Sequence, residues 1–502
     1  MLSLLRSSKR IQRTQQIAQI SLLCRGKPIS REELFAYTNG HFLVDEQRQL
    51  NRRYLNFDLD TLCDVAASAG GDSSRIVTIE KLEGGFSKAL LMKKGNGKEV
   101  IAKLPCRIAG PTSLTTACEV GVLEYVRKYT SIPAPRVFSW SSDDSNPVGA
   151  EYIIMEKVAG VPLFEQWGKM AEIEKLELIK NLTKLEAQLA AIRFPAAKNL
   201  TGAYVLVPLV VARLAPTQLR SYPLKVRNLI MGLSIQYQNS GYQLQSESYI
   251  RSHANAQMMS NLPLCYPNPL NLHYGTVTFI WAIFLLRLAR TQKIVSLIDF
   301  QSLSVLPLFL QAQWPVFLKP PQNYTKGLVQ PKLPGDFDEL DEEGKAAALQ
   351  EWSQSKLAKA YEVATVLENG VAHNAMNIPR VFRELFIRCG EVSEVGVVPL
   401  RECLIEIFRN WSSLGFTGQC PYSFSNEEIT THEHQFAEYQ AWDEVQQLAQ
   451  ECLDTDAEGW IAPQLDIEEK RRQNRELLSL YIKRMAGEKS PDEARAMWPF
   501  PG

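Results

Sequence analysis

The stretch Glu83–Pro105, "EGGFSKALLMKKGNGKEVIAKLP", combines two glycine-containing turns with runs in which apolar residues alternate. The same alternation begins earlier, in "RIVTIEKL" (Arg75–Leu82). A period of two is typical of β-strands with one buried face, and clustered glycines mark turns. We therefore predict that Gly84 and Gly85 lie in a turn between two strands, and that Lys103 lies on the next strand.

The flanking sequence extends this β-rich region and then changes character. "TTACEVGVLEYVRKYT" (Thr115–Thr130) predicts a helix with a capping box from Thr116 to Glu119. "EYIIMEKVAGVPL" (Glu151–Leu163) predicts another strand and a turn. Beyond Leu163 most of the chain has apolar residues at helical spacing. The expected fold class is α+β, with a small β-rich N-terminal lobe and a larger, mainly helical C-terminal lobe.

Length and composition restrict the possible functions. The 502 residues suffice for two or three domains. Because 55 basic residues balance 55 acidic ones, the net charge is zero and gives no indication of a nucleic-acid partner. The nine cysteines include no CxxC pair, which argues against a zinc site and a disulfide framework. The apolar run "TVTFIWAIFLL" (Thr276–Leu286) is shorter than the roughly 20 residues a membrane span needs, so we expect a buried strand or helix and no membrane span.

The N-terminal residues have a composition of their own. The first 31 residues carry seven basic side chains and no acid before Glu32, and Leu and Ile can form an apolar stripe on a helix. Such a segment is typical of a mitochondrial presequence, and a disordered basic arm is the alternative. We predict a presequence over residues 1–33, an N-terminal lobe over 34–158 and a C-terminal lobe over 159–502 that includes a catalytic-loop region at 264–305. The presequence predicts a mitochondrial location.

A small β-rich lobe followed by a larger helical lobe resembles the protein-kinase-like plan, in which a nucleotide binds between the lobes, and several residues occur in the order of that plan. Backbone N–H groups at Gly84 and Gly85 could approach phosphates, although a plain hairpin turn explains them equally well. Lys103 could contact phosphates or be a solvated edge charge. Glu119 follows sixteen residues later and could form an ion pair with Lys103, close the capping box, or do both.

Two further segments complete this order. In "YIIMEKVAG" the backbone from Glu156 to Val158 could hydrogen-bond a purine where the chain crosses between lobes. In "IDFQS" (Ile298–Ser302), Asp299 follows a strand, where a carboxylate could bind Mg²⁺ that bridges phosphates.

With these motifs the chain resembles the aminoglycoside phosphotransferase family, and in particular its fungal mitochondrial "altered inheritance of mitochondria" branch. The phrases "TTACEVGVLEYVRKYTSIPAPRVFSW" and "IDFQSLSVLPLFLQAQWPVFL" are similar to that branch, and the resemblance covers roughly Leu50 to Pro501. It implies a protein-kinase-like bilobal fold, ATP and Mg²⁺ as cofactors, and transfer of the γ-phosphoryl group to the hydroxyl of an unknown small molecule.

The catalytic loop departs from the family's pattern of His-x-Asp, four residues, and Asn. The corresponding positions in "LCYPNPLNLHYG" (Leu264–Gly275) are Tyr266, Asn268 and His273, or Tyr274 in place of His273 if Pro269 is an insertion. Asn268 can position a hydroxyl but cannot accept its proton. The interval from Asn268 to Asp299 also exceeds the family's, and the surplus coincides with the apolar run at 276–290. Either the loop has diverged, or the segment is translated non-coding sequence.

Two hypotheses of function follow. In the first, the protein is a mitochondrial phosphotransferase in which Lys103 clamps phosphates, Glu119 orients Lys103, Asp299 holds Mg²⁺ and Asn268 contacts the acceptor. In the second, it is a catalytically inactive kinase-like protein, a pseudokinase, that binds nucleotide or acts as a scaffold with protein partners. The pair His432 and His434 is predicted to lie on a solvated helix face rather than to bind metal, because helix positions i and i+2 point apart.

Overall fold

A computed structural model describes residues 20–192, 276–278, 287–288, 294–301, 304–306 and 308–501. Contacts divide the chain into two units. The first unit holds the described residues up to Glu124 together with Pro135–Lys157 and Ala437 onward. The second holds Tyr125–Ala134 and the described residues from Val158 to Phe436.

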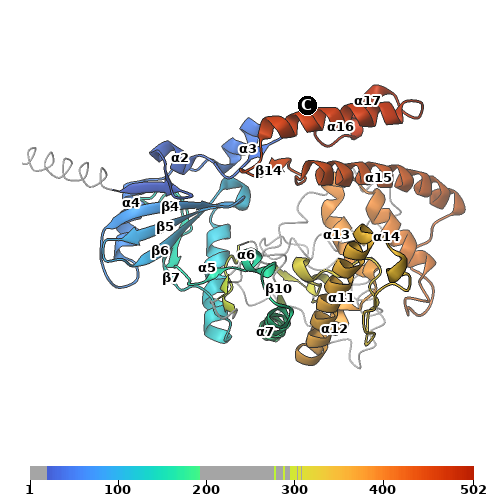
Figure 1. The fold of residues 1–502 in the computed structure, drawn as a ribbon, viewed down its shortest axis with the longest axis horizontal. Coiled ribbons are helices and arrows are strands. Elements are labelled where there is room, and N and C mark those ends of the chain that lie inside the picture. Colours follow the sequence, from blue (N-terminus) through green and yellow to red (C-terminus); the bar gives the residue numbers. More distant parts are fainter. Residues whose placement is uncertain are drawn as a thin grey trace, which may run out of the picture. The chain divides into compact units, whose positions relative to one another are not determined.

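The first unit is built on a seven-stranded sheet with the order β2-β1-β4-β5-β6-β8-β7 (Figure 1). Strand β1 is parallel to β4, and the other neighbouring strands are antiparallel. The strands are β1 (Ser21–Cys24), β2 (Lys27–Pro28), β4 (Ile76–Glu83), β5 (Ser87–Lys94), β6 (Glu99–Pro105), β7 (Val137–Ser141) and β8 (Tyr152–Glu156). The strands predicted around the Gly84-Gly85 turn, and Lys103 on the next strand, are thus confirmed.

Side-chain alternation gives this sheet two different faces. One face supplies Ile79, Leu90 and Met92, all fully buried, to a core that helix α4 (Leu59–Ser68) completes with Leu62. The other face packs against helix α5 (Leu114–Tyr129), whose Val120 clusters with buried side chains of β8. The short helices α2 (Arg31–Phe35) and α3 (Glu46–Arg53) also belong to this unit.

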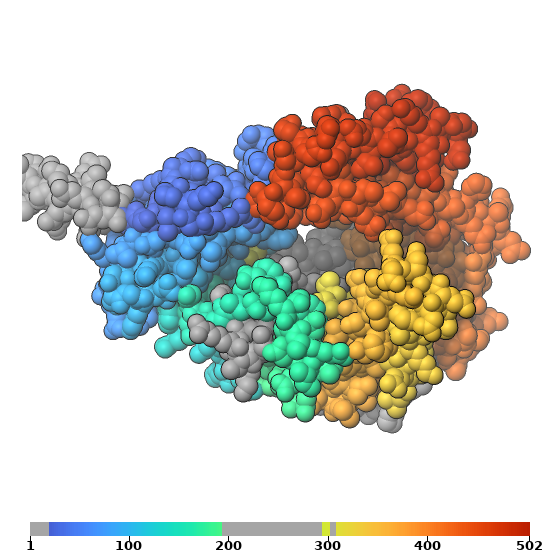
Figure 2. Space-filling view, in the orientation of Figure 1, coloured from blue at the N-terminus to red at the C-terminus, as the bar shows by residue number. Residues whose placement is uncertain are grey.

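The last part of the chain belongs by its contacts to the first unit rather than to one C-terminal lobe of 159–502. Strand β14 (Trp460–Ile461) pairs with β3 (His41–Phe42), and Leu43 shares a small apolar core with Phe500. In Figure 2 the red C-terminal residues meet the blue N-terminal residues. The helices of this part are the later residues of α15 (Asn426–Leu453), α16 (Ile467–Met485) and α17 (Pro491–Met497).

The second unit is mainly helical, so the predicted α+β class, with a β-rich N-terminal region and a helical C-terminal region, is confirmed. Its core includes Leu318, Tyr361, Leu385 and Ile407. The helices are α6 (Leu163–Trp167), α7 (Glu172–Ala190), α10 (Leu308–Gln311), α11 (Glu342–Glu368), α12 (Gly370–Met376), α13 (Arg380–Val395) and α14 (Val398–Arg409). Short strands are β9 (Val161–Pro162), β10 (Thr276–Thr278), β11 (Arg287–Leu288), β12 (Ile294–Ser296) and β13 (Ser304–Leu306).

None of the helices in the described part of the chain has the length and apolar character needed to cross a membrane. Of the apolar run Thr276–Leu286, the first three residues form β10, and residues 279–286 lie outside the described residues.

Candidate functional site

The central feature of the candidate site is a buried ion pair between Lys103 and Glu119. The Lys103 Nζ lies 2.7 Å from Oε1 and 2.9 Å from Oε2 of Glu119. The side chains are 9% and 4% exposed. Two hydrogen bonds to one carboxylate fix the position of the ammonium group, which explains how a flexible lysine can be held in one place. The ion pair is one of the two roles that the sequence left open for Glu119, and it is the role that the resemblance to kinase-like proteins implies.

Helix α5 begins earlier than the capping box predicted, and this frees Glu119 for the pair. The first helical residue is Leu114, so Thr116 lies inside the helix and is not its N-cap. The Thr116 hydroxyl is buried and makes no hydrogen bond to the described residues. Ahead of the helix, Ser113 adopts a left-handed φ of 64° and donates its N–H to Glu151 Oε1 at 2.7 Å. The predicted capping box is therefore wrong, because Thr116 lies inside the helix, and Glu151 accepts the N–H of the residue that precedes it.

An apolar row lies beside Lys103 on the same face of the sheet. Cross-strand pairing aligns Leu82 with Ala89 and Ala89 with Lys103. Leu82 is 43% exposed, and Ala89 is half-buried. In the next row Ile101 is also half-buried and packs against the small cluster around Val120. A flat aromatic ring could cover this surface while its charged substituent reaches Lys103. Sequence reasoning missed the row, although the strand alternation contains the signal.

The Gly84-Gly85 turn connects β4 to β5 and is closed by a hydrogen bond from Gly84 N–H to the Ser87 carbonyl at 3.1 Å. Neither glycine has a positive φ. A Cβ on Gly84 would come no closer than 3.8 Å to another atom, and a Cβ on Gly85 would meet nothing within 4 Å. The described chain therefore needs glycine at neither position for its own backbone or packing.

The segment from Glu156 to Val158 begins with the last residue of β8. The Glu156 N–H donates to the Arg136 carbonyl at 2.8 Å, so this group is already used. Lys157 forms an ion pair with Glu99 at 2.6 Å, which anchors the segment to β6. If a purine binds here, the N–H of Val158 is the donor that could serve it.

Asp299 belongs to the second unit and follows strand β12 after two residues. Its side chain is exposed, and its φ of 69° is left-handed. A left-handed non-glycine residue costs of the order of 1 kcal/mol or more and is enriched at functional sites. The neighbouring Leu297 N–H donates to the Pro133 carbonyl at 2.8 Å, and Phe300 is buried. The backbone on both sides of Asp299 is therefore held in place.

The remaining predictions concern the catalytic loop and the pair His432 and His434. Asn268, with the whole loop 264–275, lies outside the described residues. His432 is fully buried and its Nε2 lies 2.8 Å from Glu402 Oε2, so the predicted solvated position is wrong for this residue. His434 is exposed as predicted. Within the described ranges no cluster of three or more His, Cys, Asp or Glu side chains could hold a metal ion.

One carboxyl of the second unit has a strongly changed affinity for protons. Burial raises the pKa of Glu186, on α7, to about 8, although its hydrogen bond with Tyr361 acts in the opposite direction. The Tyr361 hydroxyl lies 2.9 Å from Glu186 Oε2 and 3.4 Å from the Gln313 carbonyl. Glu186 is therefore largely protonated at neutral pH. No sequence motif singles it out.

Comparison with solved structures finds phosphotransferases. A putative aminoglycoside phosphotransferase from Ralstonia eutropha is 14% identical, with 72% of this chain and 98% of that chain covered and a TM-score of 0.37. A macrolide 2'-phosphotransferase from Brachybacterium faecium is 16% identical, with 64% of this chain and 99% of that chain covered and a TM-score of 0.30. No family model matches the chain.

Comparison with curated proteins finds fungal relatives. A subtelomeric hrmA-associated cluster protein of Aspergillus fumigatus is 28% identical over 495 residues, which cover 83% of this chain and 95% of the relative. The mitochondrial "altered inheritance of mitochondria protein 9" of Meyerozyma guilliermondii is 20% identical over 185 residues, 30% of each chain. The relatives found among curated proteins thus include the "altered inheritance of mitochondria" group that the sequence predicted, over 30% of each chain.

Proposed function

We propose that this protein binds ATP with Mg²⁺ on the sheet face that carries Lys103, and that it transfers the γ-phosphoryl group to the hydroxyl of a small molecule. The observation that supports this proposal best is the bidentate contact between Lys103 and Glu119. A buried lysine held by a carboxylate on a neighbouring helix is a fixed positive charge, and phosphate groups are its natural ligands.

The surroundings of Lys103 fit a nucleotide. The apolar row of Leu82 and Ala89 offers a surface for a purine, with Lys103 at its end. Because the chain's own packing does not require glycine at 84 or 85, the missing side chains there leave room for a ligand close to the backbone. The backbone N–H groups of such turns donate hydrogen bonds to phosphate oxygens.

Mg²⁺ would be held by few protein groups. The described residues contain no cluster of metal-binding side chains, and the exposed carboxylate of Asp299 is the candidate ligand. This donor set fits Mg²⁺, which commonly keeps several waters and binds one or two carboxylates together with substrate phosphates. Bound there, the ion would neutralise charge on the phosphates.

Phosphoryl transfer would form a bond between the acceptor oxygen and the γ-phosphorus while the bond to the bridging oxygen of ADP breaks. The hydroxyl proton must then pass to a base. Asn268 has no such capacity, so it would orient the hydroxyl and leave the proton to solvent or to the phosphate itself. Loss of a general base typically lowers the rate 10²- to 10⁴-fold, so we propose slow transfer.

A second candidate function is nucleotide binding without transfer, in a protein that acts through protein partners. The observation in its favour is the loop itself, which has Tyr266, Asn268 and His273 in place of His, Asp and Asn. Affinity for ATP can survive such changes because binding and turnover depend on different groups.

We further propose that the protein acts in mitochondria. The name of the Meyerozyma relative places that protein there, and the acid-free, basic composition of residues 1–31 is what a presequence requires.

Formation of ADP distinguishes the two candidates. The purified full chain is incubated with Mg·ATP and a panel of small hydroxyl compounds, next to an Asn268→Asp variant and a Lys103→Met variant. A transferase gives acceptor-dependent ADP, abolished in Lys103→Met and increased in Asn268→Asp. ATP binding without ADP formation by any form identifies the second candidate. Absence of ATP binding by the wild type overturns both.

A further inference from the structure

The glycine turn is held by residues that lie far from it in the sequence. The Gly85 carbonyl accepts a hydrogen bond from Arg53 Nε at 3.1 Å. The carbonyl of the next residue, Phe86, accepts from the N–H of Cys106 at 2.8 Å. The Cys106 thiol in turn lies 3.6 Å from the Arg53 carbonyl. Two successive peptide groups of the turn are therefore fixed from outside.

Arg53 is the last residue of α3 and is itself fixed on every side. It is 2% exposed. One terminal nitrogen, Nη1, donates to the carbonyl and the side chain of Gln49 at 3.2 and 2.7 Å. The other, Nη2, lies 2.5 Å from Glu458 Oε2. The ring centroid of Phe42 lies 4.7 Å from the guanidinium carbon. A planar guanidinium holds its five N–H donors in a rigid fork, so these contacts fix the direction in which Nε points.

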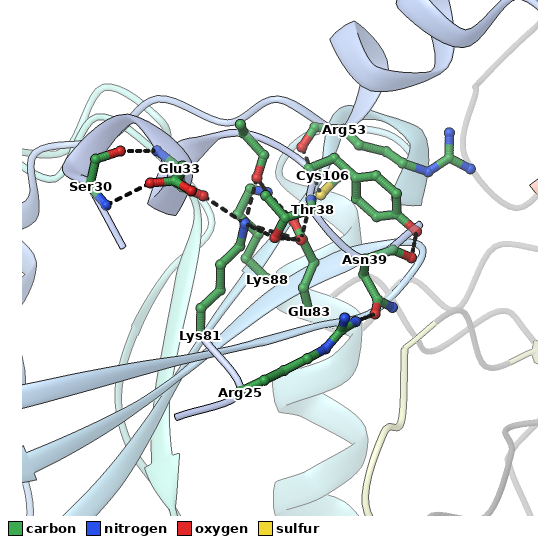
Figure 3. Close-up of polar contacts among 12 residues, drawn as sticks. Arg25, Ser30, Glu33, Thr38, Asn39, Arg53, Lys81, Glu83, Lys88 and Cys106 are labelled. Carbon is green, nitrogen blue, oxygen red and sulfur yellow. Dashed lines mark hydrogen bonds and ion pairs between the residues drawn. The ribbon is translucent and has the colours of Figure 1, made fainter. Parts of the chain in front are cut away.

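The strand end that leads into the turn is fixed as well (Figure 3). Glu83, whose side chain is 3% exposed, lies 3.0 Å from Lys81 Nζ and forms a second ion pair with Lys88. It also accepts the N–H of Thr38 at 2.7 Å. Both lysine side chains are fully buried, and burial lowers the pKa of Lys81. With Glu83 held on one side and Phe86 on the other, the contact of Arg53 with Gly85 decides how the tip is oriented.

Because the peptide group is planar, the contact of Arg53 with the Gly85 carbonyl also sets the direction of the following N–H. In a trans peptide the C=O and the following N–H point in opposite directions. When Arg53 fixes the Gly85 carbonyl toward itself, the N–H of Phe86 is directed away from Arg53. Without the contact, Gly85 has no Cβ to restrict its backbone, so this peptide could rotate more easily.

The partner of Arg53 comes from the far end of the sequence. Glu458 lies in a turn in which its own N–H donates to Asp456 Oδ1 at 2.9 Å. Two residues later, Trp460 Nε1 donates to the Asn39 carbonyl at 3.0 Å. The C-terminal part of the first unit thus holds the charge that compensates Arg53.

We propose that Arg53 is a positioning residue for nucleotide phosphate: it orients the Gly85–Phe86 peptide so that its N–H faces a phosphate oxygen, and Glu458 keeps Arg53 in place. This inference rests on the proposed nucleotide site and adds to it a residue that does not touch the nucleotide. It predicts that Arg53 matters for ligands with phosphates and not for the nucleoside alone.

The test compares equilibrium binding of Mg·ATP and of adenosine to the full-length protein. The variants are Arg53→Met and Glu458→Gln, and the matched control is Arg48→Met, an exposed arginine on the same helix that lies 3.8 Å from Asp45. We expect Arg53→Met to weaken ATP binding roughly tenfold, the value of one hydrogen bond, with adenosine binding unchanged. Glu458→Gln should weaken ATP binding less, and Arg48→Met should change neither ligand.

Several results would overturn the proposal. If Arg53→Met weakens ATP and adenosine equally, Arg53 supports the fold and does not position phosphate. If neither affinity changes, the contact has no role in binding. Should Arg53→Met not fold, Glu458→Gln decides by the same ratio of the two affinities. If the wild-type protein binds neither ligand, the proposed nucleotide site itself is refuted. This outcome is distinct from equal binding of ATP by the wild type and Arg53→Met, which refutes only the role of Arg53.

Discussion

The Lys103 ammonium lies 2.7 Å from one carboxylate oxygen of Glu119 and 2.9 Å from the other, and both side chains are buried. A buried pair of this kind is costly to break from one side only. We expect Glu119→Leu to lower the free energy of unfolding by about 3 kcal/mol, because it removes the carboxylate that compensates Lys103.

The double variant Lys103→Met/Glu119→Leu separates stability from binding. Replacing both charges by apolar groups of similar size should restore most of the stability, whereas the affinity for ATP should stay lost. Urea denaturation measures the first quantity and nucleotide titration the second. A double variant no more stable than Glu119→Leu would contradict this account of the pair.

The backbone of Gly40 lies close to β14. Its φ is 129°, and a Cβ would lie 2.3 Å from Trp460 Nε1 and 2.6 Å from the Ile461 carbonyl. Gly40→Ala should therefore separate β3 from β14 and cost at least about 3 kcal/mol of stability.

Gly97→Ala is the matched control for Gly40→Ala. Gly97 also has a positive φ, 84°, but a Cβ there would meet nothing within 4 Å. Its substitution should cost only the backbone strain, about 1 kcal/mol. Equal losses of melting temperature in the two variants would show that the close approach to Trp460 is not important.

The raised pKa of Glu186 makes stability depend on pH. Its pKa is about 8 in the folded protein and 4.5 ordinarily, so the folded state binds the proton more tightly. The resulting stabilisation is complete below pH 4.5 and is lost as pH rises toward 8, with a slope of at most about 1.4 kcal/mol per pH unit.

The variant Glu186→Gln keeps the shape of this side chain but does not titrate. We expect its unfolding free energy, measured by denaturant titration between pH 5 and 8, to fall less with pH than that of the wild type. Glu172→Gln, on the same helix with a half-exposed carboxylate paired to Lys356, is the control and should follow the wild type. Parallel curves for all three proteins would refute the assignment.

The position of β1 limits where a presequence could end. Ser21–Cys24 pairs in parallel with β4, and Leu22 packs against the core of the first unit. Cleavage within the predicted presequence of 1–33, between Cys24 and Glu33, would remove this strand. We therefore expect the mature N-terminus to lie before Ile20, as N-terminal sequencing of protein from mitochondria would show. A mature chain that starts after Pro28 would contradict this expectation.

Local patterns in the sequence predicted part of this site and could not predict the rest. The strands on either side of Gly84-Gly85 follow from alternation, which is a property of short segments. The pair of Lys103 with Glu119 follows from the resemblance to kinase-like proteins and not from a local pattern. The contact of Arg53 with Glu458 joins residues 405 positions apart, and no local pattern records it. His432 shows the same limit, because the face of α15 that is buried depends on its packing partner Glu402.

Titration of the full-length protein with ATP and Mg²⁺ tests the central claim most directly, with Lys103→Met compared against Lys98→Met. Lys98 is an exposed lysine directly before β6, the strand that carries Lys103. Among the contacts described, its side chain forms an ion pair only with the exposed Asp72. The account predicts saturable binding to the wild type and to Lys98→Met, and binding weakened by at least about tenfold in Lys103→Met. Equal affinities of the three proteins, or no binding to the wild type, would contradict it.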